Sequence, residues 1–177
     1  RNGNSTRRLS VDEATEYAKL FPDRRPGSPG DIDSAQWMRD EFEQLPGSLR
    51  TKTVPATTID PGTGRSVGLV NVEAVLAGRT RELVVVYAHR DTADASGRGS
   101  DAVGQLSLLA LARELSGTRD RRRTYLFVST DGATLNGGGA RALAERLAGR
   151  GAVVAVIGID RLGAGGTLRV DTAPSGR

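Results

Sequence analysis

Hydrophobic and polar residues follow two spacings along the chain, and these predict where helices and strands fall. Apolar residues three to four positions apart predict helices over residues 11–20, 34–45, 101–115 and 140–147. Continuous apolar runs predict strands buried on both faces over residues 83–88, 124–129 and 153–159. Shorter β-rich segments predict further strands over residues 51–59, 70–78 and 167–170. The first of these contains Pro55, which suits an edge strand.

The order of these elements indicates the fold class. Strand, helix, strand, helix, strand is the order of right-handed crossovers on a parallel sheet. We therefore expect an α/β fold in three layers, with a mostly parallel central sheet and helices on both faces. The early strands should extend this sheet as antiparallel partners. Asp33 or Ser34 is expected to cap the helix over 34–45, and Pro46 to end it.

Two segments differ in composition and set the expected domain limits. Residues 1–10 are polar and basic without periodicity, which is typical of a linker or the edge of an excised segment. Residues 11–177 are expected to form a single domain that is a piece of a longer protein. With 37% hydrophobic residues, the chain can build one modest core. No apolar run approaches the roughly 20 residues of a membrane span.

The composition excludes several kinds of site. The chain has no cysteine, which excludes disulfide scaffolds, zinc fingers and thiol catalysis. His89 is the only histidine, so the chain alone cannot build a histidine-rich metal cage. The formal net charge is +4, carried by scattered arginines, and aromatic residues make up only 4%. We expect no nucleic-acid partner, because stacking platforms are missing and the basic run at 119–123 is typical of a solvated loop. The alternative, an arginine-driven binder of anionic surfaces, predicts binding that weakens steeply with salt.

Polar residues with metal-binding chemistry follow the buried strands. His89 ends the first of them, Asp160 follows the third, and Asp101 opens the helix between the first two. Because the carboxyl ends of parallel strands meet at one edge of a sheet, these three residues are the candidate metal ligands. Asp91 is spaced to orient the His89 ring from behind. The alternatives are that Asp101 is a helix cap, that Asp160 turns the strand end, and that His89 is tied by Asp91 without coordinating anything.

Four segments carry a resemblance to a known family. They are Arg25–Ser28 with the following Ala35–Trp37, Val84–Asp91, Ser100–Gly104, and Val156–Gly163. On these segments the chain resembles the bacterial di-zinc aminopeptidase family, which includes glutamate carboxypeptidase-like and glutaminyl-cyclase-like proteins. The resemblance implies a zinc-aminopeptidase-like fold. It also implies that His89 and Asp160 match terminal metal ligands, Asp101 the carboxylate that bridges two metals, and Asp91 the residue that orients the histidine.

The chain departs from the family pattern where the family has two adjacent glutamates, the general base and a metal ligand. Alignment on Gly139-Ala140 places Ala133 and Thr134 at these positions, and neither can take a proton from water near neutral pH. Asp131, two positions early, is the one remaining candidate base. The family's final histidine ligand has no counterpart, because no histidine follows Asp160.

These departures lead to an expected function and an alternative. We expect a peptidase-like pseudoenzyme without catalytic residues or a cofactor, which binds or scaffolds a protein or peptide ligand and keeps at most a vestigial or weak metal site. The alternative is an active metal-dependent aminopeptidase or related hydrolase with zinc, using Asp131 as base and ligands supplied from outside this chain. Because the resembling family is usually exported, an extracytoplasmic domain is expected, anchored to a membrane through segments outside this chain.

Overall fold

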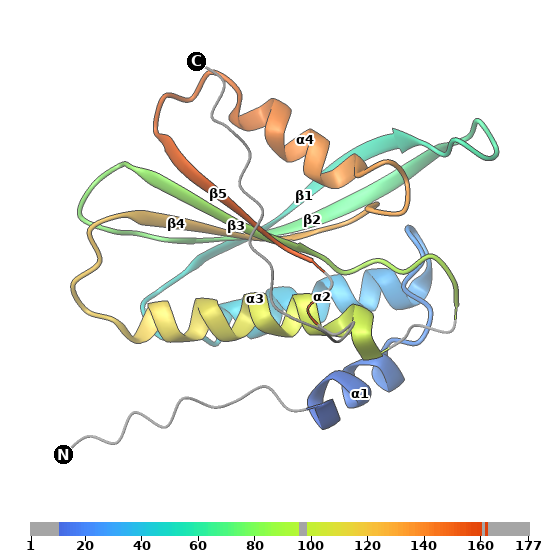
Figure 1. Ribbon diagram of the computed structural model, residues 1–177, viewed down its shortest axis with the longest axis horizontal. Coiled ribbons are helices and arrows are strands. Elements are labelled where there is room, and N and C mark those ends of the chain that lie inside the picture. Colours follow the sequence, from blue (N-terminus) through green and yellow to red (C-terminus); the bar gives the residue numbers. More distant parts are fainter. Residues whose placement is uncertain (1–10, 96–98, 161, 163–177) are drawn as a thin grey trace.

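The chain folds into helices and strands in the predicted order (Figure 1). The structure is a computed structural model that describes residues 11–95, 99–160 and 162, without the side chains of residues 11 and 99–101. The elements are α1 (Val11–Leu20), α2 (Pro29–Glu43), β1 (Arg50–Ile59), β2 (Ser66–Leu76), β3 (Leu83–His89), α3 (Gly99–Gly117), β4 (Thr124–Thr130), α4 (Gly138–Leu147) and β5 (Val153–Ile159). The predicted linker at 1–10 and the candidate strand at 167–170 lie outside the described residues.

The strands form one sheet in the order β1-β2-β4-β3-β5. Strand β3 pairs in parallel with β4 on one side and with β5 on the other. Strands β1 and β2 form an antiparallel hairpin, and β2 pairs antiparallel with β4. The α/β fold and the antiparallel extension by the early strands are confirmed. The described sheet is mixed. The pairs β1–β2 and β2–β4 are antiparallel, and the pairs β3–β4 and β3–β5 are parallel.

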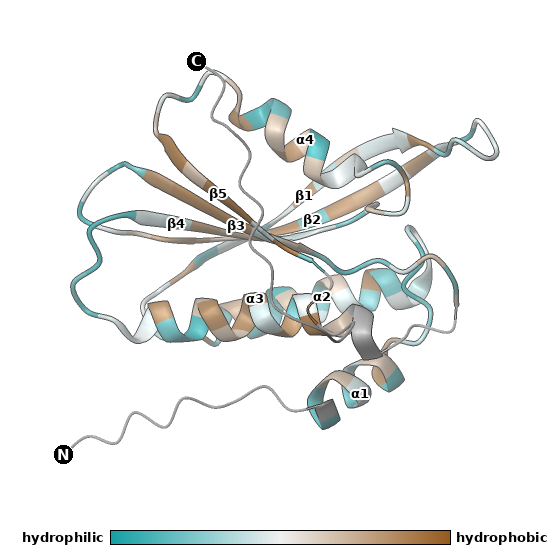
Figure 2. Cartoon of the chain, viewed as in Figure 1, coloured by the Kyte–Doolittle hydropathy of each residue, from teal (hydrophilic) through white to brown (hydrophobic). Residues whose placement is uncertain are grey.

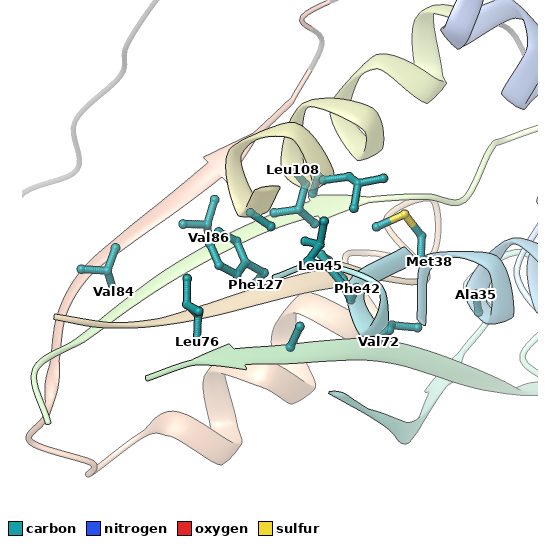
Figure 3. Close-up of a cluster of buried hydrophobic side chains, with 14 residues drawn as sticks. Ala35, Met38, Phe42, Leu45, Val72, Leu76, Val84, Val86, Leu108 and Phe127 are labelled. Carbon is teal, nitrogen blue, oxygen red and sulfur yellow. The ribbon is translucent and has the colours of Figure 1, made fainter. Parts of the chain in front are cut away.

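Helices cover both faces of the sheet and create the three layers. Helices α2 and α3 lie on one face and α4 lies on the other (Figure 1). The main core fills the space between the sheet and the α2–α3 layer, and its buried members come from both helices and from β2, β3 and β4. Its labelled side chains in Figure 3 include Met38, Phe42, Val86, Leu108 and Phe127, which converge on one another. A smaller cluster around Leu143 seals α4 against the opposite face.

Helix α2 begins earlier than predicted. Its N-cap is Ser28, whose Oγ accepts a hydrogen bond from the Asp31 amide at 3.2 Å. Pro29 follows in the first turn, where its missing N–H leaves no intrahelical bond unmade. The prediction that Asp33 or Ser34 caps this helix is therefore wrong. Pro26 and Pro29 lie in a stretch whose composition predicts a turn, but proline is also favoured in the first turn of a helix, and α2 begins at Pro29.

Strand β5 is much more exposed than its apolar sequence predicts. Val154, Val156 and Ile157 are 47%, 61% and 46% exposed, so the expectation of burial on both faces is wrong for this strand. Among the strands of the described residues, β5 stands at the end of the sheet order, and β3 is its one neighbour there. Figure 2 shows β5 as apolar as the buried β3 beside it. Apolar composition alone does not tell whether a strand has a second neighbour.

Helix α3 lies close to the strand ends that carry the candidate site. A Cβ atom built on Gly104 would lie 3.5 Å from the Ile159 carbonyl oxygen and 3.8 Å from the Ala88 Cβ, which is ordinary van der Waals contact with the ends of β5 and β3. The helix buries Ala102, Leu108 and Ala112 completely. Neither α3 nor any other helix of the described residues combines the length and apolar character of a membrane span.

Candidate functional site

The parallel pairings bring two of the predicted ligands together. His89 pairs with Thr130, and Ala88 pairs with Ile159, so residues 89, 131 and 160 leave the sheet at the same edge. The His89 Nε2 atom lies 3.4 Å from Asp160 Oδ1. The side chain of Asp101, the third predicted ligand, lies outside the described residues, although its helix begins at this edge. The prediction that His89 and Asp160 are neighbours therefore agrees with the geometry.

Asp91 holds the His89 ring from behind. The His89 Nδ1 atom lies 3.2 Å from the Asp91 carbonyl oxygen and 3.7 Å from Asp91 Oδ1. The Asp91 carboxylate raises the pKa of His89 above its ordinary value, while partial burial acts in the opposite direction. This contact fixes the ring so that Nε2 is directed at Asp160.

The carboxylate of Asp91 is also the anchor of the loop between β4 and α4. Its oxygens accept hydrogen bonds from the Ala133 amide at 3.0 Å, the Thr134 amide at 2.9 Å and the Thr134 Oγ1 at 2.8 Å. Burial by itself raises the pKa of Asp91, but His89 and the Thr134 and Ala133 donors together hold this pKa below its usual value. Asp91 therefore holds in place Ala133 and Thr134, the two residues that the resemblance sets at the glutamate positions.

Behind these residues lies a buried ionic cluster that sequence reasoning missed, made of Asp31, Arg90 and Asp131. Arg90 is 0% exposed, and its Nε lies 2.9 Å from Asp31 Oδ1. Its Nη2 lies 3.3 Å from Asp131 Oδ2. One guanidinium thus compensates two carboxyl groups that come from α2 and from the end of β4. Arg90 stands next to His89 in the sequence, and this position was the only signal that pointed to it.

Asp131 is immobilised inside this cluster. Its side chain is 1% exposed, and its oxygens accept hydrogen bonds from the Val70 amide at 3.0 Å and from the Gly132 amide. Burial raises its pKa, although Arg90 and these amides act in the opposite direction. The backbone of Asp131 is held as well, because its amide donates to Asn71 Oδ1 at 3.1 Å. Asp131 therefore points into the protein and contacts groups that hold it there.

A second buried arginine joins the N-terminal loop to this edge of the sheet. Arg24 is 0% exposed, and its Nε donates to the Arg90 carbonyl oxygen at 3.0 Å. Its Nη1 donates to the Phe21 carbonyl oxygen at 2.6 Å, and its guanidinium lies 5.2 Å from the centre of the Tyr17 ring. The loop after α1 is thereby fixed against the residues that follow β3.

The buried cluster predicts how stability changes with pH. The pKa of Asp31 is raised to about 7, mainly by burial. The Arg90 guanidinium opposes this rise and the Asp131 carboxyl group adds to it. The folded state then holds a proton that the unfolded chain releases at lower pH, so stability should fall as pH rises from about 4 to about 7. A shift of this size corresponds to at most about 4 kcal/mol. Urea titrations across this range should show the slope.

The variant Asp31→Asn should flatten this slope, because an amide stays neutral throughout. His89 has a raised pKa and changes stability in the same direction, so the difference between variant and parent slopes is the quantity to measure. Asp33→Asn, at an exposed position of the same helix, is the control. Equal slopes for Asp31→Asn and the parent would contradict the assignment of this proton to Asp31.

The described side chains do not fit a di-zinc centre. Zinc in proteins takes about four nitrogen, sulfur or oxygen ligands. Among the residues whose side chains the structure describes, no group of three or more histidine, cysteine, aspartate or glutamate side chains is placed to hold a metal ion. His89 and Asp160 supply two donors, and they lie within contact distance of each other.

Comparisons with known proteins agree with the resemblance found in the sequence. Among solved structures, the chain is similar to a glutaminyl cyclase from an Acidobacteriales bacterium, with a TM-score of 0.71, 18% identity, and coverage of 89% of this chain and 60% of that chain. A leucine aminopeptidase precursor from Bacteroides thetaiotaomicron gives a TM-score of 0.56 at 17% identity, covering 72% of this chain and 48% of that chain. A Zn-dependent exopeptidase from Parabacteroides distasonis gives 0.53 at 16%, with the same coverages.

These structures show the fold, and a sequence profile shows the family. The chain spans about three fifths of the length of the glutaminyl cyclase. Comparison with curated protein sequences gave no match. The profile of peptidase family M28 matches residues 71–175, a stretch that contains the strand ends at His89, Asp131 and Asp160. Because this match covers more than half of the chain and agrees with the sheet order and the strand-end residues, the chain belongs to peptidase family M28.

Proposed function

We propose that this M28 family member has lost peptidase activity and serves as a binding or scaffolding domain for a protein or peptide. One observation carries the proposal. Ala133 and Thr134, which the resemblance places at the two glutamate positions, are exposed at the strand-end edge and are fixed there by Asp91. Hydrolysis of a peptide bond by a metal-bound water needs a base within hydrogen-bond reach of that water. Neither side chain provides a carboxylate.

The position of Asp131 supports the same proposal. A general base must reach the proton that it removes, at about 2.6–3.2 Å or through one water. The carboxylate of Asp131 contacts Arg90 and the Val70 amide instead, and it is 1% exposed. To act as a base, it would have to leave both contacts and uncover the buried charge of Arg90. The removal of a base typically lowers a rate by about 10²–10⁴-fold.

The alternative of an active hydrolase keeps one supporting fact, namely that the family and two of the similar structures are peptidases. It requires zinc, Asp131 as base and ligands from outside this chain. In either case, we propose an extracytoplasmic location with a membrane anchor outside this segment, supported by the family resemblance alone.

Metal content and turnover distinguish the two hypotheses. After incubation with zinc and desalting, we expect well below one zinc per chain by inductively coupled plasma analysis. With zinc or cobalt added, a panel of chromogenic aminoacyl substrates should show no turnover above the buffer rate. Asp131→Asn and His89→Ala should leave both results unchanged.

A control variant makes a residual signal interpretable. Asp120→Asn changes an exposed carboxylate that pairs with Arg79 on the surface and lies outside the strand-end cluster. Stoichiometric zinc together with turnover that either Asp131→Asn or His89→Ala abolishes, while Asp120→Asn retains it, would replace the proposal with the hydrolase.

A further inference from the structure

A groove lies between α1, α2 and α3, apart from the strand-end residues. Helix α1 lies on the side of α3 that faces away from the sheet (Figure 1). The cavity has a volume of about 380 Å³. None of His89, Asp91, Asp131 or Asp160 lines it, so its use does not depend on whether the strand-end site is catalytic.

The floor of the groove is apolar and aromatic. It is formed by Tyr17, Leu20, Trp37, Leu106, Leu109 and Ala110. The rings of Tyr17 and Trp37 pack edge to face, with 5.1 Å between their centres, and form the aromatic part of this floor. Leu20, one of these residues, is 66% exposed. The lining therefore offers apolar surface to a ligand.

The walls are acidic, although the chain as a whole is basic. Asp12, Glu13 and Glu16 come from α1, and Glu41 comes from α2 on the other wall. The one basic residue in the lining is Arg113, which lies 3.5 Å from Glu41. Lys19 pairs with Glu16 nearby. Carboxylates therefore outnumber cations in this groove of a protein with a net charge of +4.

We infer that this groove docks a cationic amphipathic helix of a partner protein. Such a helix places large apolar residues at i, i+3 and i+4 on the floor, in the manner of known helix-in-groove complexes. Its lysine or arginine residues then face Asp12 and Glu16 on one wall and Glu41 on the other. Nucleic acid and anionic lipid surfaces are disfavoured, because their phosphates would face the same carboxylates. The inference deepens the proposed binding role but stands without the loss of catalysis.

Trp37 makes the groove directly observable, since it is the only tryptophan of the chain. The probe is a synthetic helical peptide without tyrosine or tryptophan, with leucines on one face and lysines on both sides of that face. Titration of the whole chain should change the Trp37 emission in a saturable way. The apparent affinity should fall as salt rises, because the cations and carboxylates are exposed and screened.

Charge variants test whether the acidic walls select the ligand. The triple variant Asp12→Asn, Glu16→Gln, Glu41→Gln should weaken the peptide about tenfold, since exposed ion pairs contribute little singly and add over three. Ala110→Lys, which places a cation on the floor, should abolish the saturable change. Glu145→Gln, at an exposed position of α4, should bind like the parent and is the matched control. Circular dichroism should confirm that every variant folds.

Two results would overturn the inference. One is equal affinity for a peptide in which glutamates replace the lysines, because charge would then play no part. The other is an absent or non-saturable response of Trp37 at low salt in a folded parent chain. Zinc loading and turnover do not enter this experiment, so its failure leaves the proposed loss of peptidase activity untouched, and the reverse also holds.

Discussion

Replacing Arg90 by methionine is expected to lower the free energy of unfolding by about 3–5 kcal/mol, or roughly 10 °C in Tm for a domain of this size. Methionine fills much of the volume of the arginine stem but leaves the carboxyl groups of Asp31 and Asp131 buried without their cation. The removal of one member of a buried ionic cluster is more damaging than the loss of an exposed pair. Urea unfolding followed by circular dichroism measures the difference.

Two further variants make this prediction sharp. Arg79→Met removes an arginine that is 67% exposed and pairs with Asp120 on the surface, so a change below about 1 kcal/mol is expected. Adding Asp131→Asn to Arg90→Met should recover part of the loss, because the raised pKa of Asp31 leaves that group able to stay protonated. A loss below about 1 kcal/mol for Arg90→Met, or strictly additive losses in the double variant, would show that the cluster is not coupled.

The second large effect is expected for Gly139→Ala at the start of α4. A Cβ atom there would clash with the Asp131 carbonyl oxygen and with Asn71 Oδ1. Neither neighbour can move freely, because the Gly139 amide donates to Asp131 at 2.9 Å and Asn71 Nδ2 donates to the Gly139 carbonyl at 2.8 Å. Forced overpacking of this kind lowers stability by about 3 kcal/mol. Thermal unfolding should therefore begin at a clearly lower temperature.

Gly151→Ala is the matched control, since its Cβ would meet nothing within 4 Å. It should leave stability within about 0.5 kcal/mol of the parent. If both alanine variants unfold like the parent, then the β4–α4 loop can shift, and the contacts of Asp131 and Asn71 do not fix it.

Most of the fold was predictable, because local patterns of apolar residues indicate the type and the order of its helices and strands. The apolar runs that became β3 and β4 are buried, as expected, since a strand covered on both faces must be apolar throughout. The exposure of β5 was not predictable, because a run of apolar residues such as Val153–Ile159 is compatible with a central strand and with an outer strand of a sheet. The start of α2 was missed because proline ends helices in most positions but favours the first turn.

The site was predictable only where strand ends define it. His89 and Asp160 meet because each ends a parallel strand, and this rule needs no knowledge of side-chain packing. The pairing of Arg90 with Asp31 joins residues far apart in the sequence, and no spacing signals it. Arginine is so frequent in this chain that a buried one could not be told from the exposed ones.

The outer position of β5 also affects how the site moves. Within the part of the chain that the structure describes, β5 pairs with β3 alone and most of its side chains are exposed, so we expect its free energy of local opening to lie below that of global unfolding. Asp160 directly follows this strand, whereas its contact His89 ends the central strand β3. We therefore expect local opening of β5 to break the contact between these two residues, and amide hydrogen exchange along β5 should detect this opening while the core stays closed.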